Sequence, residues 1–435
     1  MEAMPGRNAK AKTAQQWVRG FQRKLYAAAK KNGTRRFKIL QDKVWKRETL
    51  EEAWRRVAAN HGSAGVDGQT IEWIKEKYGV ERLLTEIAKE LTEETFNPGM
   101  IRRVYIPKPG RREKRPLGIP TVKDRVAQMA VKLVIEPLFD ADFLPCSYGF
   151  RPKRSNQQAA EKVHQLINTR KWVVDVDLKS YFDTIPHERL KQRVRTRVSD
   201  SRTLALIWKW LKAKVLEDGK ATEPERGSPQ GGVLSPLLSN IYLHQLDQMW
   251  KRGDGELIRY ADDLVILCYS REQAEKALVR VREIVTGLGL EVNEEKTKIR
   301  HIAEGFDFLG FTFREGISPK SGRLVRVKVP RKKSIQSIGQ KVKATLQKTC
   351  LGKPVREAIA RINPKLRGWA NYFKIGNSYV AALKVQHRVC EELRIFVRRR
   401  HSRKDRRGYR HWPDSFFYRE GLLYVPNLIR RSNAA

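Results

Sequence analysis

Two acid-bearing segments constrain the fold of this 435-residue chain more than any other feature of its sequence. The first, residues 172–178, reads WVVDVDL. Because successive side chains of a strand point to opposite faces, Asp175 and Asp177 share one face with Val173. Burying two carboxylates on one face of an apolar strand is costly unless they bind a cation or face a cleft. A solvated edge strand is the alternative that this segment alone leaves open.

The second segment, residues 257–267, has two apolar runs around Ala261-Asp262-Asp263, which predicts a β-hairpin with carboxylates at its tip. Aspartate is also common in turns for conformational reasons alone. If the two segments converge, Asp177, Asp262 and Asp263 form a cluster that stays ionised only when divalent cations compensate the repulsion. Oxygen ligands favour Mg²⁺ or Mn²⁺. Two such ions about 4 Å apart suit in-line phosphoryl transfer.

The charge of the chain indicates the partner of such a site. Lys and Arg total 89 against 48 Asp and Glu, a formal net charge of +41. This imbalance favours nucleic acid over an anionic membrane, because neutralised phosphates release counterions. The four cysteines form no CxxC pair, which favours a reducing cytoplasm over a disulfide scaffold. No apolar run reaches the roughly 18 residues of a membrane span. We therefore expect a location in the cytosol or nucleoid of a bacterium and no membrane partner.

Hydrophobic periodicity predicts helices and strands in irregular alternation, and hence an α+β fold. We expect one or two short amphipathic helices with outward cations before residue 50, and a helical stretch over 69–91. Strands are predicted at 101–106, 171–178 and 256–269. Further helices are predicted within 121–169, with a break near 145–152, and at 186–198, 202–214, 235–251, 271–287 and beyond about 331.

The sequences YADD at 260–263 and DLKSYF at 177–182 resemble the palm signature of reverse transcriptases. The whole chain resembles the reverse transcriptase/maturase encoded by group II introns, through motifs at 64–68, 106–109, 116–120, 147–152, 228–232, 308–311 and 367–373. The resemblance implies a right-hand polymerase. It divides the chain into a basic N-terminal helical extension (1–50), fingers (51–170), palm (171–315) and a helical thumb or maturase domain with a short basic tail (316–435).

The resemblance also implies roles for single residues. Asp177, Asp262 and Asp263 would hold the metal ions, and Lys296 would protonate the departing pyrophosphate. The residues that bind the dNTP would be Lys108, Arg115, Phe182 and Gln230. Phe182 would exclude a ribose 2′-hydroxyl, although ordinary core packing is its alternative.

Nucleic acid would be contacted by two further groups of residues. The primer grip would comprise Phe308, Leu309 and Gly310, whose aromatic surroundings are equally consistent with core packing. Phosphate contacts would come from arginines before and within the C-terminal region, namely Arg151, Arg367, Arg398, Arg399, Arg400, Arg406 and Arg407.

The implied function is that of an RNA-directed DNA polymerase of a group II intron, which uses Mg²⁺, or Mn²⁺, and dNTPs. It would extend a DNA primer on an RNA template, bind its intron RNA to assist splicing, and support retromobility at target DNA. Many relatives carry a C-terminal endonuclease module with paired cysteines and histidines. Because this chain has no such pairs, we expect mobility to rely on an existing primer end. A domesticated or defence-associated reverse transcriptase is the alternative that the sequence leaves open.

Overall fold

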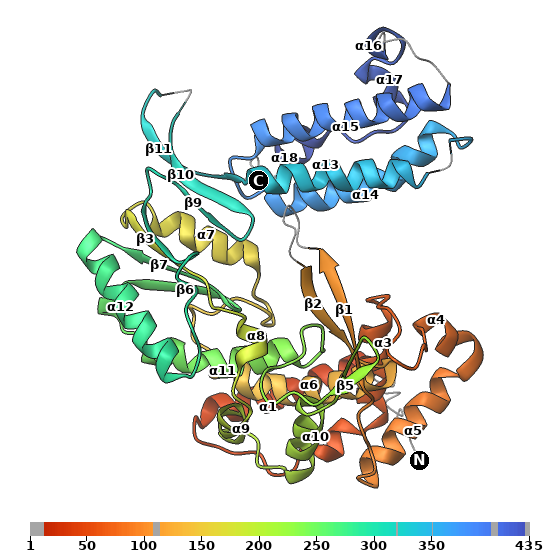
Figure 1. Cartoon of the computed structure of the whole chain (residues 1–435), viewed down its shortest axis with the longest axis vertical. Helices are drawn as coiled ribbons and strands as arrows, with labels where there is room; N and C mark the ends of the chain where they lie inside the picture. The colour runs from red at the N-terminus through yellow and green to blue at the C-terminus, as the bar shows by residue number, and fades with distance from the viewer. Residues whose placement is uncertain (1–12, 108–113, 319–320, 350, 402–407, 431–435) are drawn as a thin grey trace, which may run out of the picture.

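A computed structural model describes residues 13–107, 114–318, 321–349, 351–401 and 408–430. Figure 1 shows three parts: a lower lobe of helices with a small sheet, a central sheet on the left, and an elongated helical bundle at the upper right. Helices and mixed sheets alternate irregularly along the chain, so the predicted α+β class is confirmed.

The lower lobe is built around α6 (Val122–Asp140), which is buried on nearly all sides because apolar residues surround its axis. Its sheet has the order β2-β1-β4-β5. The other elements of the lobe are α1 (Ala14–Lys31), α2 (Gln41–Val44), α3 (Arg47–Ala58), α4 (Ile71–Trp73), the π-helix η1 (Ile74–Tyr78), α5 (Val80–Thr92), α9 (His187–Arg195), α10 (Ser201–Leu211), β1 (Ile101–Pro107), β2 (Lys114–Ile119), β4 (Val215–Glu217) and β5 (Lys220–Thr222).

The central sheet is antiparallel, with the order β6-β7-β3-β8. Both of its faces are covered, because Val174 and Ile266 join one apolar core and Val173 and Val265 join another. The elements of this part are β3 (Trp172–Val176), β6 (Glu256–Tyr260), β7 (Asp263–Cys268), β8 (Lys298–His301), α7 (Asn156–Leu166), α8 (Tyr181–Thr184), α11 (Ser235–Met249), η2 (Arg252–Asp254) and α12 (Arg271–Gly287).

A three-stranded sheet of order β11-β10-β9 connects the central sheet to the helical bundle. It comprises β9 (Phe306–Phe308), β10 (Phe311–Ile317) and β11 (Leu324–Pro330). The bundle comprises α13 (Lys332–Gln347), α14 (Val355–Phe373), α15 (Tyr379–Arg400), α16 (Gly408–His411), α17 (Asp414–Arg419) and α18 (Val425–Arg430). None of the helices described for this chain is long and apolar enough to cross a membrane.

Two local predictions need correction. The helical stretch predicted over 69–91 is broken at Gly79, whose φ of +92° is a left-handed conformation that suits glycine, so α5 starts only at Val80. The helices before residue 50 are not all short, because α1 has 18 residues. Its cations Arg19 and Arg23 point outward as expected, while Val18 and Leu25 are buried.

Helix α1 is an integral part of the lower lobe. Gln22 Nε2 donates to Leu133 O at 2.8 Å, and Lys30 Nζ donates to Ala141 O at 2.9 Å. Residue 50 lies inside α3, so the domain boundary suggested there does not coincide with the end of an element.

Candidate active site

The register of the central sheet brings the acid-bearing segments together. Strands β3 and β7 pair antiparallel, and Val176 opposite Leu264 is the last pair at this end of the ladder, so Asp177, which follows Val176, and Asp263, which precedes Leu264, lie at the same end of the two strands. Tyr260 pairs with Asp263 across β6 and β7, which leaves Ala261 and Asp262 as the turn of the hairpin. The predicted hairpin is therefore confirmed, and its tip lies at the end of β3 that carries Asp177.

The hairpin turn is a strained and closely packed piece of backbone. Ala261 has a φ of +57°, a left-handed conformation that costs an alanine of order 1 kcal/mol or more. Gly149 lies against it so closely that a Cβ at that position would be 2.3 Å from Ala261 N. Such strain persists only where the surrounding structure determines the conformation, and it is common at functional sites.

The carboxyl groups in this region influence one another electrostatically. Desolvation by the surrounding protein, together with the charges of Asp262, Asp177 and Asp175, raises the pKa of Asp263 to about 6, although its side chain keeps contact with solvent. Burial also raises the pKa of Asp262, with the charge of Asp177 adding to the effect. A bound cation would offset both the desolvation of these carboxylates and their mutual repulsion.

Lys296 lies beside the first of these acids. Its Nζ is 2.9 Å from Asp177 Oδ2, and both side chains are partly exposed. The loop that carries Lys296 also binds the backbone of Asp177. Asn293 N donates to Asp177 O at 2.8 Å, and Asp177 N donates to Thr297 Oγ1 at 3.2 Å. The expected palm lysine therefore contacts a candidate metal ligand directly.

Within the described ranges, no group of three or more His, Cys, Asp or Glu side chains is arranged closely enough to hold a metal ion. The three predicted ligands are nevertheless near enough to affect each other's charge state. Their carboxylate oxygens are the donor type that Mg²⁺ and Mn²⁺ prefer, so the residues present fit a divalent cation in chemistry.

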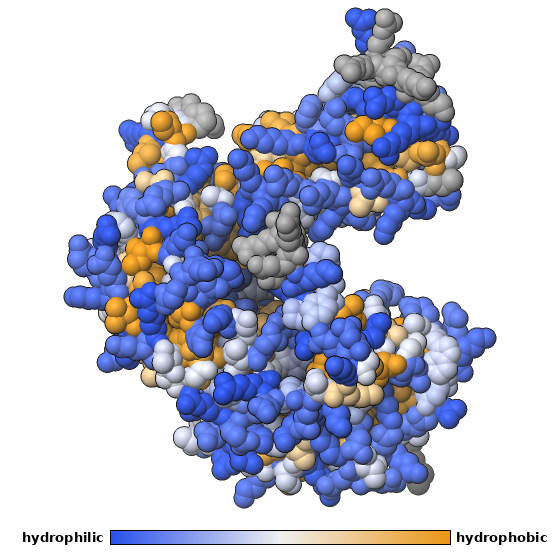
Figure 2. Space-filling model, viewed as in Figure 1, coloured by the Kyte–Doolittle hydropathy of each residue, from blue (hydrophilic) through white to orange (hydrophobic). Residues whose placement is uncertain are grey.

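A charged cleft of about 890 Å³ adjoins Asp177 and separates the central sheet from the helical bundle. In the space-filling view, the molecule is hollowed between the bundle and the lower lobe, with mostly hydrophilic walls (Figure 2). Among the described residues that line the cleft, Asp177 is the only acid. The cations that line it are Arg115, Lys296, Arg331, Lys333, Lys341 and Lys365.

Two of the three predicted primer-grip residues reach this cleft. Leu309 and Gly310 line it, whereas Phe308 is buried in the apolar core with 4% of its surface exposed. Tyr372 OH donates to Leu309 O at 2.8 Å, and Ser334 Oγ donates to Gly310 O at 3.1 Å. The turn between β9 and β10 is thus attached to helices α13 and α14 of the bundle.

Two of the predicted dNTP-binding residues, Phe182 and Gln230, lie at the loop 228–232, which is hydrogen-bonded to α8 and to the small sheet. Ser228 N donates to Phe182 O at 2.7 Å, and Gly118 N donates to Gln230 O at 2.6 Å. Gln230 Nε2 also donates to Asp183 Oδ2 at 3.2 Å. Arg115 lines the charged cleft with Asp177, whereas Phe182 and Gln230 are not among its lining residues. Lys108 lies outside the described residues.

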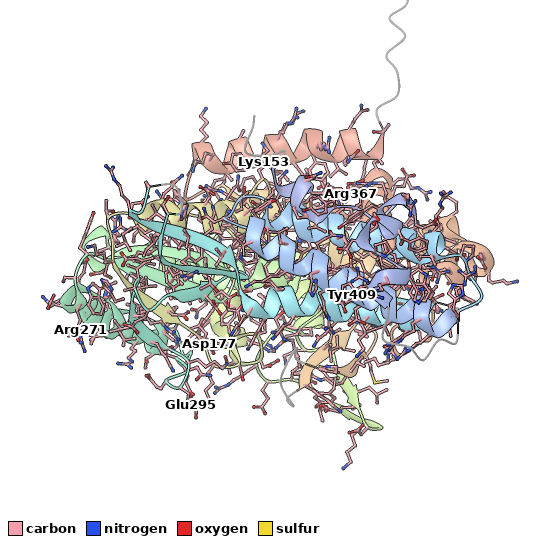
Figure 3. The ribbon with its side chains drawn as sticks, turned by 90° about the horizontal axis from the view of Figure 1, so that it is seen from above. Lys153, Asp177, Arg271, Glu295, Arg367 and Tyr409 are labelled. Carbon is pink, nitrogen blue, oxygen red and sulfur yellow. The ribbon has the colours of Figure 1, made fainter. Side chains whose placement is uncertain are left out.

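The predicted phosphate-binding arginines fall into distinct environments. Arg151 is committed to internal partners, contrary to expectation: its Nε donates to Asp140 Oδ1 at 2.8 Å, and its Nη1 donates to Leu144 O and Ser147 O. Arg367 and Arg399 are exposed on the bundle, where Figure 3 labels Arg367. Arg398 is half-buried, Arg400 Nη1 donates to Lys353 O at 2.7 Å, and Arg406 and Arg407 lie outside the described residues.

Several residues of the site were not expected from the sequence. The cleft cations Lys333 and Lys341, with Ser337 between them, stand at i, i+4 and i+8 of α13 and so share a helix face. This spacing can be recognised in the sequence and would have predicted a basic face of the helix. The pairing of Arg259 with Asp247 beneath the hairpin had no such signal, because an acid on a helix ordinarily indicates a solvated position.

Comparison with known proteins identifies relatives over most of the chain. A family model described as reverse transcriptase (RNA-dependent DNA polymerase) matches residues 106–313, and one described as group II intron, maturase-specific domain matches residues 335–412. Protein YkfC of Escherichia coli (strain K12) is 37% identical over 332 residues, which cover 67% of this chain and 86% of that protein. Group II intron-encoded protein LtrA of Lactococcus lactis subsp. cremoris is 28% identical over 386 residues, covering 69% of this chain and 64% of that protein.

Proposed function

Because the chain belongs to the family of group II intron reverse transcriptases/maturases, whose enzymatic class is RNA-directed DNA polymerase, we propose that it extends a DNA primer on an RNA template at the Asp177–Asp262–Asp263 site. The register that brings Asp177 and Asp263 to the same end of the paired strands β3 and β7, with Asp177 in a cation-lined cleft, is the observation that carries this proposal. Nucleic acid is the partner class of this family. Intron RNA, the primer–template duplex and target DNA are the specific partners that we propose.

We propose that the primer–template duplex lies in the charged cleft. Cations from β2, from the loop 293–297 that carries Lys296 (the 296 loop) and from helices α13 and α14 face one space, where they would neutralise phosphates on two sides. Leu309 and Gly310 line the same space as Asp177. A primer held at that turn would therefore end near the candidate metal ligands.

A polymerase of this family depends on divalent metal ions, and we propose Mg²⁺, with Mn²⁺ as a substitute, on Asp177, Asp262 and Asp263. When bound, the ions would stabilise the charge on the attacking and leaving oxygens. The raised pKa of Asp262 and that of Asp263, both due first to desolvation by the surrounding protein, support this assignment, since cation binding favours the ionised forms. Asp177 would exchange its contact with Lys296 for the metal.

The chain's own side chains would orient the nucleotide and move the proton. Arg115, with Lys108, would hold the triphosphate through charge-assisted hydrogen bonds. Phe182 would lie under the sugar and exclude a 2′-hydroxyl, and Gln230 would contact the nucleotide from the loop 228–232. Lys296, which lines the cleft beside Asp177, would donate a proton from Nζ to the departing pyrophosphate once the metal has replaced it on Asp177.

We further propose that the helical bundle binds intron RNA and assists splicing. The match of residues 335–412 to the maturase-specific domain supports this role, as do the exposed arginines Arg367 and Arg399. Splicing would be RNA chemistry, with the protein contributing charge neutralisation and shape recognition. The fingers, palm and thumb boundaries at residues 51, 171 and 316 belong to the same proposal, as does support of retromobility.

The test is primer extension on an RNA template, with dNTPs and with or without Mg²⁺, beside a splicing assay on a group II intron RNA. We expect extension that requires Mg²⁺, is abolished in Asp262→Ala, and gains ribonucleotide incorporation in Phe182→Ala. Extension by Asp262→Ala at the wild-type rate would contradict the site assignment. Normal extension without any effect on splicing would instead favour a domesticated or defence-associated enzyme.

A further inference from the structure

A fully buried ion pair lies beneath the hairpin turn, and the polymerase proposal gives it no role. Arg259, on β6, and Asp247, on α11, both have side chains with 0% exposure. Arg259 Nε donates to Asp247 Oδ1 at 2.7 Å, and Nη2 donates to Asp247 Oδ2 at 2.5 Å. Burying both charges of such a pair gives little net stability compared with apolar residues of similar volume. Net stabilisation therefore does not explain why a buried ion pair occupies this position.

The remaining donors of Arg259 connect the pair to the turn. Nη1 donates to Ala261 O at 3.1 Å and to Asn240 Oδ1 at 3.0 Å, while Nη2 donates to Ser147 Oγ at 2.8 Å. With the two bonds to Asp247, all five N–H groups of the guanidinium have an acceptor. A lysine has three donors and no planar fork, so it would not satisfy this set of acceptors.

The network contacts the turn in two places, through Arg259 and through Gly149. Arg259 binds the carbonyl group of Ala261, the residue with the left-handed φ that directly precedes Asp262. Asn240 Nδ2 donates to Gly149 O at 2.7 Å, and Gly149 packs on the amide nitrogen of Ala261. The strained backbone at Ala261 is thus held by one hydrogen bond and by one close packing contact, and both lead to Arg259.

We propose that Arg259 is a positioning residue, which fixes the Ala261–Asp262 turn so that the carboxylates of Asp262 and Asp263 face their cations before any metal arrives. This inference rests on the proposed function, because it assumes that these acids bind metal. Groups that orient metal ligands from behind commonly change metal affinity by about 10- to 100-fold when removed.

The test replaces both charges at once, with Arg259→Met and Asp247→Leu in one chain. No charge is then left buried alone, so much of the stability is retained. Two quantities are measured: hydrogen exchange of the peptide spanning residues 260–264 in metal-free protein, and the affinity for Mn²⁺ by electron paramagnetic resonance. We expect faster exchange at the turn and Mn²⁺ binding weaker by about 10- to 100-fold.

The matched control is a second buried arginine, Arg197, none of whose described hydrogen bonds reaches the hairpin. It is 1% exposed; its Nε donates to Asp142 Oδ2 at 2.6 Å, its Nη2 donates to Asp142 Oδ1 and Ala29 O, and its Nη1 donates to the carbonyl groups of Asn32 and Arg35. Arg197→Met with Asp142→Leu likewise removes both members of a bidentate ion pair, in which Asp142 is 27% exposed. We expect this control to leave both the exchange of residues 260–264 and the Mn²⁺ affinity at wild-type values.

Asn240→Ala is the variant that keeps both charges paired, should the double variant not fold. It removes the link from Arg259 to Gly149, so a smaller change in the same direction is expected. Wild-type exchange at the turn in either folded variant would overturn the positioning role, whatever the metal result. If wild type and Asp262→Ala bind Mn²⁺ equally, the metal-site proposal fails instead, and the exchange data still test the positioning role.

Discussion

Two turns, at Ala261 and at Leu309, are held in the same unusual backbone conformation by different chemical groups. Ala261 has a φ of +57° and Leu309 a φ of +47°, so each turn holds a non-glycine residue in a left-handed conformation. The Ala261 turn is held from within its own part of the molecule, by a buried guanidinium. Neutral hydroxyl groups of the helical bundle, on Tyr372 and Ser334, hold the turn at Leu309 and Gly310.

This difference separates the candidate metal site from the turn that would contact the primer. The described hydrogen bonds that hold the acid-bearing turn come from Arg259 and, through Gly149, from Asn240, none of which belongs to the bundle. The turn at Leu309 is instead held by α13 and α14. We infer that the geometry of the metal site depends on the hairpin network, whereas the position of a primer depends on the bundle.

The largest effect is expected from the acid-bearing turn itself. Asp262→Asn should lower the rate of single-nucleotide incorporation by about 10³-fold, equivalent to about 4 kcal/mol of transition-state stabilisation. Primer–template affinity, measured by fluorescence anisotropy, should stay within about twofold of wild type, since the cleft cations remain. A loss that appears mainly in affinity would remove the distinction between the two turns.

The pH dependence of stability and of Mn²⁺ affinity tests the electrostatics of the acid-bearing turn. The pKa of Asp263 is raised from 3.8 to about 6, by desolvation first. Because the folded state holds this proton more tightly than the unfolded chain, metal-free protein should lose stability as pH rises from about 4 to 6. Mn²⁺ affinity should fall about tenfold for each pH unit below 6, because protons compete for the carboxylate.

Asp263→Asn should remove much of this stability change, measured by urea unfolding between pH 4 and 7. Asp175→Asn is the matched control, since burial raises the pKa of Asp175 to about 6 as well. We expect Asp175→Asn to flatten the stability profile without abolishing Mn²⁺ binding. Identical pH profiles for Asp263→Asn and wild type would contradict the electrostatic description of the turn.

A smaller effect is expected at the turn held by the bundle. Tyr372→Phe removes the hydrogen bond to Leu309 O, which is worth about 0.5–1.5 kcal/mol. Burial raises the pKa of Tyr372 to about 12, so the hydroxyl is a donor throughout the ordinary assay range. We expect primer dissociation about two- to tenfold faster and Mn²⁺ affinity unchanged. Altered Mn²⁺ affinity in Tyr372→Phe would show that the two turns are not independent.

The smallest effect concerns single cations of the cleft. Lys341→Ala should reduce the slope of log affinity against log salt by about 1, as expected for one lost phosphate contact. Lys24→Ala, on the exposed face of α1 and far from the cleft in sequence, is the control for general charge. Equal slopes for Lys341→Ala and wild type would exclude a phosphate contact at this position.

The sequence was most informative where local pattern and tertiary contact agree. Strict alternation in residues 172–178 fixes which face carries Asp177, and the two apolar runs around Ala261 fix the hairpin; antiparallel pairing then aligns the acids. Gly79 breaks a helical pattern that hydrophobic spacing alone continues, because backbone conformation and not side-chain polarity ends the element.

Residues whose roles depend on distant partners were not predictable in this way. Arg151 looks like a surface cation until Asp140 and two carbonyl groups are placed around it. Arg259 and Asp247 are twelve positions apart on different elements, so no periodicity relates them. The cleft cations gather from β2, the 296 loop and the bundle, which only the folded chain brings together.

The central claim, that Asp177 and Asp262 act jointly on shared cations, is tested most directly by a double-mutant cycle in single-turnover nucleotide incorporation with saturating Mg²⁺. Residues that act as one unit are strongly non-additive. We predict that Asp177→Ala with Asp262→Ala is no slower than the more impaired single variant. Rate losses that multiply in the double variant would contradict the account, since they would show two acids working independently.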